Sequence, residues 1–129
     1  MRYLSPLRPR ISDRAAVAQV LGSEQGKTVD GWRLLPLYVG DTGPAGGRLA
    51  EIELIPQRAV SMQGVKFPPS FTHRLGTVSE TNVNCDVYMD DDGLQYWVYA
   101  DDSAVGKKGD LMHIVYGTSD KRSHVVHEP

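Results

Sequence analysis

The sequence lacks several features that would assign it to a familiar class. Its single cysteine, Cys85, excludes an internal disulfide and a cysteine-based zinc site. No apolar run approaches the ~18 residues that a membrane-spanning helix needs. The N-terminus has no charged-then-apolar signal pattern, because Arg8, Pro9 and Arg10 stand where an apolar run would be. We therefore expect a protein without membrane contact that stays in the cytoplasm or joins a particle made there.

Catalytic and cofactor motifs are missing as well. There is no Gly-x-Ser-x-Gly elbow. The stretch 22–28 looks like a phosphate-binding loop, but it has three residues between its glycines where that motif needs four. Cys85 is followed by Asp86, whose charge opposes thiolate formation. The four histidines have no metal-ligand spacing. These absences favour a non-catalytic protein without cofactor or metal over an enzyme.

Length and composition are those of one ordinary globular domain, with 129 residues, 40% apolar and 23% charged. The net charge of −2 hides a separation of charge along the chain. Residues 1–14 contain four arginines and one acid, whereas residues 86–102 contain six acids and neither Lys nor Arg. Such a separation can steer association with a charged protein or with another copy of the chain. Nucleic acid is a poor candidate partner, because four arginines on a mildly acidic body make a weak positive field.

Residues 1–10 contain two prolines and alternate arginines with apolar residues. Proline prevents a helix here and favours an extended backbone in the residue before it. We therefore predict an extended basic N-terminal arm over residues 1–10, which lies along its own domain or a neighbour, and a single β-rich domain over residues 11–129. A disordered tail is the alternative.

One helix is predicted directly after the arm. Ser12 is placed as the N-cap, and Ile11 and Ala16 are spaced for a hydrophobic staple. Apolar residues at helical spacing follow as far as Leu21, and Gly22 is a natural stop.

The remainder of the chain is typical of short strands separated by turns. Strand-like segments are 28–39 (interrupted by Gly31 and Pro36), 48–55, 72–79, the two runs that flank Asp92-Gly93, 110–116 and 123–127. The fold class is therefore predicted as α+β and predominantly β. Six or seven short strands would form an antiparallel sheet or a small β-barrel, with one short N-terminal helix.

The run from 83 to 100 gives the most specific prediction. Asp92-Gly93 is a strong signal for a two-residue hairpin loop, which would place Met89 opposite Tyr96 and Val87 opposite Val98. The face with Cys85 and Val87 would be the core. The other face would present Asp86, Tyr88, Trp97 and Tyr99 as an acidic and aromatic recognition surface, because Tyr and Trp are favoured at interfaces.

We therefore expect a non-catalytic protein-interaction module, either an accessory or structural protein of a larger assembly such as a viral particle, or a small inhibitor that acts through a charged surface. Its partner would be another protein or copies of itself. The expected partner-binding residues form a basic set and an acidic-aromatic set. They are Arg2, Arg8, Arg10, Arg14, Asp86, Tyr88, Asp90, Asp91, Asp92, Trp97, Tyr99, Asp101 and Asp102.

The alternative is a small β-rich enzyme or ligand-binding protein with an aromatic-lined pocket. Either His113 or Asp86 would be its polar group. The lining would comprise Trp32, Tyr38, Tyr88, Trp97, Tyr99 and Tyr116.

Overall fold

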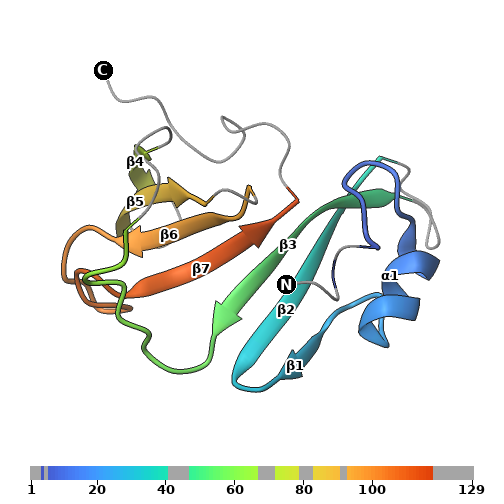
Figure 1. The fold of residues 1–129 in the computed structure, drawn as a ribbon, viewed down its shortest axis with the longest axis horizontal. Helices are drawn as coiled ribbons and strands as arrows, with labels where there is room; N and C mark the ends of the chain where they lie inside the picture. The colour runs from blue at the N-terminus through green and yellow to red at the C-terminus, as the bar shows by residue number, and fades with distance from the viewer. Residues whose placement is uncertain are drawn as a thin grey trace.

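A computed structural model describes residue 4 and residues 6–40, 47–66, 72–78, 83–90 and 93–117, with the backbone alone for 72–78. One helix precedes seven strands (Figure 1). They are α1 (Arg14–Leu21), β1 (Lys27–Val29), β2 (Trp32–Val39), β3 (Arg48–Pro56), β4 (Thr72–Val78), β5 (Val83–Met89), β6 (Gln95–Tyr99) and β7 (Leu111–Tyr116). The predicted fold class, α+β and predominantly β with one short N-terminal helix, is confirmed. The predicted strand at 123–127 lies outside the described residues.

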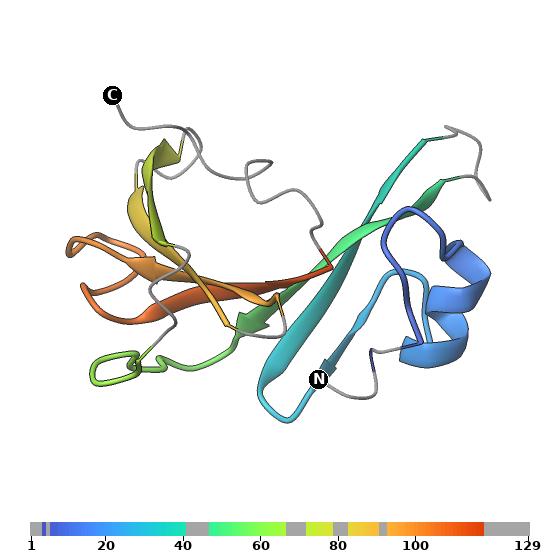
Figure 2. The ribbon, with the colours of Figure 1, turned by 45° about the horizontal axis from the view of Figure 1, so that its top comes forward.

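The strands form one sheet in the order β1-β2-β3-β7-β6-β5-β4, and every neighbouring pair is antiparallel. Strands β1 and β4 stand at its two edges, so the described strands form an open sheet and not a closed barrel. Strand β7 lies between β3 and β6 and joins the half that carries α1 to the β4–β6 half (Figure 1). The sheet is strongly twisted, as is usual for antiparallel strands (Figure 2).

Helix α1 begins one residue later than predicted. Its N-cap is Asp13, whose Oδ1 accepts a hydrogen bond from the N–H of Ala16 at 2.9 Å. Ser12, the predicted cap, accepts a hydrogen bond from the N–H of Arg8 through its hydroxyl oxygen at 2.8 Å. The predicted staple is absent, because Ile11 is 67% exposed. The helix ends at Gly22 in the left-handed conformation, as predicted.

Two Asp-Gly pairs occur in hairpins, and the structure uses them differently. Asp30 and Gly31 form a two-residue loop between β1 and β2, both with positive φ (50° and 82°). The prediction that Gly31 interrupts the strand-like segment 28–39 is therefore confirmed, because the segment divides into β1 and β2 at this loop. At the second pair, Met89 lies opposite Gln95 and Val87 opposite Trp97, so the connection from β5 to β6 runs from residue 90 to residue 94.

The predicted register of this second hairpin was therefore wrong by one residue. The longer connection is favoured by Asp90 at its start. The Oδ1 atom of Asp90 accepts a hydrogen bond from the N–H of Leu94 at 3.0 Å, and its Oδ2 atom accepts one from the Tyr96 hydroxyl at 2.9 Å. Gly93 stands in the left-handed region with φ 85°, which glycine adopts without steric cost.

Buried apolar side chains form two clusters, one on each face of the sheet. Ile114 and Val115 belong to different clusters, because successive side chains of a strand point to opposite faces. The first cluster contains Leu4, Leu7, Val17, Leu21, Leu34, Leu49, Ile52, Leu54, Leu94, Val98, Leu111 and Ile114. The second contains Val83, Cys85, Val87, Met89, Trp97 and Val115.

The described part of the N-terminal segment lies along its own domain. Leu4 and Leu7 are 0% and 2% exposed and belong to the first cluster. The Tyr116 hydroxyl lies 3.0 Å from both of their carbonyl oxygens. The sequence left open whether the arm lies along its own domain or along a neighbour. Leu4 and Leu7 lie against their own domain. Among the described residues, no helix has the length and apolar character needed to cross a membrane.

Candidate functional site

The predicted aromatic recognition face is divided between the two sides of the sheet. Because the register differs by one residue, Trp97 points to the same side as Val87 and is 6% exposed. Its ring centroid lies 4.9 Å from that of His113, and its Nε1 atom donates a hydrogen bond to Gln95 Oε1 at 3.4 Å. The prediction that Trp97 shares an outward face with Tyr88 was wrong, and Trp97 is a core residue.

Several predicted acidic residues make local contacts that shape turns. Asp90 closes the β5–β6 hairpin. Asp101 accepts a hydrogen bond from the side-chain amide of Asn84 at 3.1 Å, and Asp102 accepts one from the N–H of Lys108 at 2.9 Å. Asp101, Asp102 and Lys108 are exposed. Asp91, Asp92 and Arg2 lie outside the described residues.

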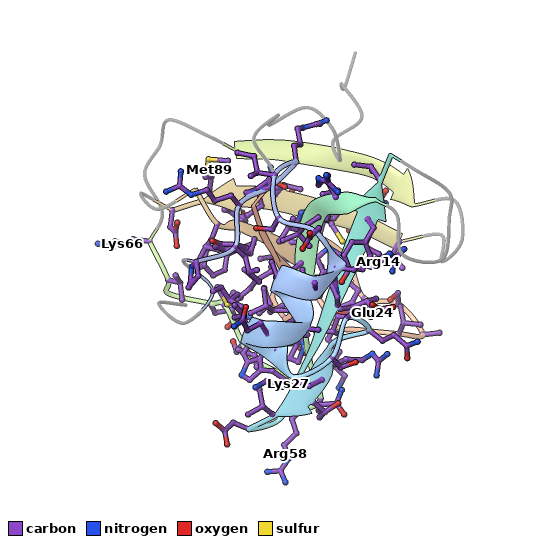
Figure 3. The ribbon with its side chains drawn as sticks, turned by 90° about the vertical axis from the view of Figure 1, so that its right-hand side faces the viewer. Arg14, Glu24, Lys27, Arg58, Lys66 and Met89 are labelled. Atoms are coloured by element: carbon purple, nitrogen blue, oxygen red, sulfur yellow. The ribbon has the colours of Figure 1, made fainter. Side chains whose placement is uncertain are left out.

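The predicted basic set is also divided. The Arg14 guanidinium lies 4.0 Å from the centroid of the Tyr38 ring and 3.9 Å from a carboxylate oxygen of Glu24 (Figure 3). Arg14 is therefore held by its own chain, whereas Arg8 and Arg10 are exposed.

Three of the predicted site residues, Asp86, Tyr88 and Tyr99, line one cleft. Its volume is about 310 Å³, and it lies between the β5–β6 hairpin and two loops. The loops are joined by a hydrogen bond of 2.8 Å from the Met62 N–H to the Gly109 carbonyl oxygen. The full lining is Met62, Gln63, Val65, Asp86, Tyr88, Val98, Tyr99, Ala100, Lys108 and Gly109. Sequence reasoning missed the contribution of residues 62–65, since nothing in their local pattern indicates that they meet the hairpin.

A second cleft of about 270 Å³ adjoins Tyr99. It is lined by Ile55, Pro56, Gln57, Arg58, Ala59, Tyr99, Val105, Gly106, Asp110, Leu111 and Met112. Tyr99 is therefore a wall shared by both clefts. Its hydroxyl donates to the Val105 carbonyl oxygen at 3.4 Å, and burial raises the pKa of Tyr99, with Cys85 and Asp110 adding to the rise.

Each cleft has one exposed valine in its lining. Val65, in the first cleft, is 49% exposed, and Val105, in the second, is 59% exposed. We call the two clefts, with Tyr99 between them and these two valines, the double cleft. An apolar side chain that remains in water at a cleft can be buried when a partner fills that cleft.

Of the six aromatic residues expected to line one pocket, only Tyr88 and Tyr99 line either of the two clefts. Tyr88 and Tyr99 line the first cleft. Trp32, Tyr38 and Tyr116 pack against the first core cluster. His113 lies on the other side of the sheet with Trp97, and its Nδ1 atom is 3.7 Å from a carboxylate oxygen of Glu53.

The buried thiol is unsuited to nucleophilic chemistry. Cys85 is fully buried, and burial raises its pKa to about 11, with the charge of Asp86 adding to the rise. In the part of the chain that the structure describes, no three His, Cys, Asp or Glu side chains gather in a way that could hold a metal ion.

Comparison with known proteins gives no relative: no protein-family model, curated protein or solved structure matches the chain significantly.

Proposed function

We propose that the protein is a non-catalytic protein-interaction module that binds its partner through the double cleft. The observation that carries this proposal is the position of Val65 and Val105, both largely exposed, in the linings of two clefts that share the Tyr99 ring. Interfaces concentrate their binding energy in a few side chains that fill pockets at the centre of the contact, and tyrosine is common among such residues.

The size of the clefts supports a side chain as the occupant. Both volumes lie at or below the lower limit of about 300 Å³ for pockets that hold drug-sized ligands. Each can take one or two side chains of a partner. Asp86 and Lys108 stand in the wall of the first cleft, where opposite charges can orient an incoming polar group.

Membership of a larger assembly is favoured over the inhibitor role. An inhibitor that imitates a polyanion needs acids in a uniform negative field. Asp90 and Asp102 instead accept hydrogen bonds within turns, Asp90 from the Leu94 N–H and Asp102 from the Lys108 N–H.

The proposal is tested with peptides selected from a random-sequence display library on the immobilised protein. The affinity of each enriched peptide is then measured by fluorescence anisotropy for wild type, Val65→Asp and Val105→Asp. We expect each substitution to weaken binding by about tenfold or more, because burying a valine contributes ~1.5–3 kcal/mol and ~1.4 kcal/mol is a factor of ten.

The matched control is Thr28→Asp, which introduces the same charge at an exposed β-branched residue that lines neither cleft. It should leave the affinity unchanged. Failure to enrich any peptide, or equal affinity for the wild type and both valine variants, would show that the double cleft is not a docking surface.

A further inference from the structure

A second exposed surface lies where the N-terminal segment meets the start of β3 and the end of β2. It combines three exposed arginines with two exposed apolar residues, Ile11 at 67% and Val39 at 47%. We call this set the arginine patch, and its members are Arg8, Arg10, Ile11, Val39 and Arg48.

Backbone pairing brings Arg10, Arg48 and Val39 close together from three segments, and Arg8 and Ile11 are neighbours of Arg10 along the chain. The Arg10 N–H donates a hydrogen bond to the Leu49 carbonyl oxygen at 2.6 Å, and the Leu49 N–H donates one to the Ser12 carbonyl oxygen at 2.7 Å. Arg48 pairs with Val39 of β2 on one side and forms a bridge with Asp13 on the other. Figure 2 shows the N-terminal segment beside α1 and the start of β3.

Arg10 has an unfavourable backbone conformation, with φ 67°. The other described non-glycine residue with positive φ is Asp30, which occupies a two-residue hairpin loop that requires it. A β-carbon makes the left-handed region sterically unfavourable, so glycine or asparagine would suit this position better than arginine. Strained backbone of this kind is often found at binding sites.

The charges of the patch are not neutralised within the described part of the chain. None of the ion pairs found there involves Arg8, Arg10 or Arg48, in contrast to Arg14, which contacts Glu24. Asp13 forms a backbone bridge with Arg48, and its carboxylate caps α1.

We propose that the arginine patch binds an acidic segment of a partner protein that also carries apolar side chains. The planar guanidinium group binds carboxylates through two parallel hydrogen bonds, and arginine is enriched at protein interfaces. Ile11 and Val39 add apolar surface that a sugar-phosphate backbone would not use. Recognition of an anionic membrane generally needs a cluster of about four to eight basic residues, more than the three present here.

The probe is a set of labelled synthetic peptides in which Asp or Glu alternates with Leu or Phe, with binding measured by fluorescence anisotropy. Peptides with Gln in place of the acids are the reference. We expect the acidic peptides alone to bind, and their affinity to fall as ionic strength rises from about 0.05 M to about 0.5 M.

The decisive variant is Arg10→Gly. It removes the guanidinium and also relieves the backbone strain, so we expect a higher melting temperature together with affinity reduced by about tenfold, as for the loss of one charge-assisted hydrogen-bonded pair. A purely structural role of Arg10 would not give this combination. Arg48→Gln should weaken binding without changing the melting temperature, and Arg33→Gln, at an exposed arginine near the other end of β2, should change neither.

Unchanged affinity of Arg10→Gly, or no binding of the acidic peptides by the wild type, would overturn the proposal. Tighter binding to phosphatidylserine vesicles or to single-stranded DNA than to the peptides would overturn it as well. The proposal is independent of the double cleft. Val65→Asp serves as the control here, and it should bind the acidic peptides as the wild type does.

Discussion

The substitution Leu7→Ala tests whether the N-terminal segment belongs to the core. Leu7 is 2% exposed and packs in the first cluster. The change removes three carbon atoms, worth about 2.4 kcal/mol at ~0.8 kcal/mol each, and the residual cavity brings the loss to about 3 kcal/mol. At about 2.1 cal/mol/K per residue, the unfolding entropy of 129 residues is about 270 cal/mol/K, so the melting temperature should fall by about 11 °C.

Thermal unfolding followed by circular dichroism measures this shift, and urea unfolding should give the same loss with an unchanged m-value. The control is Ile11→Ala in the same segment, which is 67% exposed and should change the free energy of unfolding by less than about 0.5 kcal/mol. If Leu7→Ala melts within about 2 °C of the wild type, the segment is not part of the core and the reasoning fails.

Three further predictions concern other positions in the chain. Trp97→Ala should lower the free energy of unfolding by about 3–5 kcal/mol in urea titrations, and an unchanged midpoint would contradict its place in the second cluster. Gly26→Ala should lower the melting temperature far more than Gly22→Ala. A β-carbon at Gly26 would lie 1.9 Å from the Leu34 carbonyl oxygen, whereas nothing lies within 4 Å at Gly22, and both have positive φ; equal losses would argue against this close approach. The Cys85 thiol should resist iodoacetamide at pH 8 unless urea unfolds the protein. Because its pKa rises from 9 to about 11 on folding, the free energy of unfolding should decline between those pH values, and less so in Cys85→Ala.

Elements that are marked by a pattern of consecutive residues were predicted closely. Helix α1 follows from apolar spacing and from the stop at Gly22, both properties of consecutive residues. The central place of β7 follows from its apolar residues on both faces, which suit a strand with neighbours on each side.

The hairpin register shows where local reasoning fails. Asp30-Gly31 forms a two-residue loop, whereas the same dipeptide at 92–93 belongs to a longer connection. The difference depends on contacts of Asp90 with Leu94 and Tyr96, across the hairpin. Because side chains alternate along a strand, a shift of one residue moved Trp97 from the predicted outer face into the core.

The class of fold, the helix with its final glycine and most of the strands could be predicted from the sequence, because capping and periodicity are properties of neighbouring residues. Two features depend on the tertiary structure: Leu4 and Leu7 belong to the core, and Val65 and Val105 line two clefts that share Tyr99. Each of these arrangements joins segments far apart in the chain, and the free energy that holds them together comes from burial against residues that no local pattern identifies.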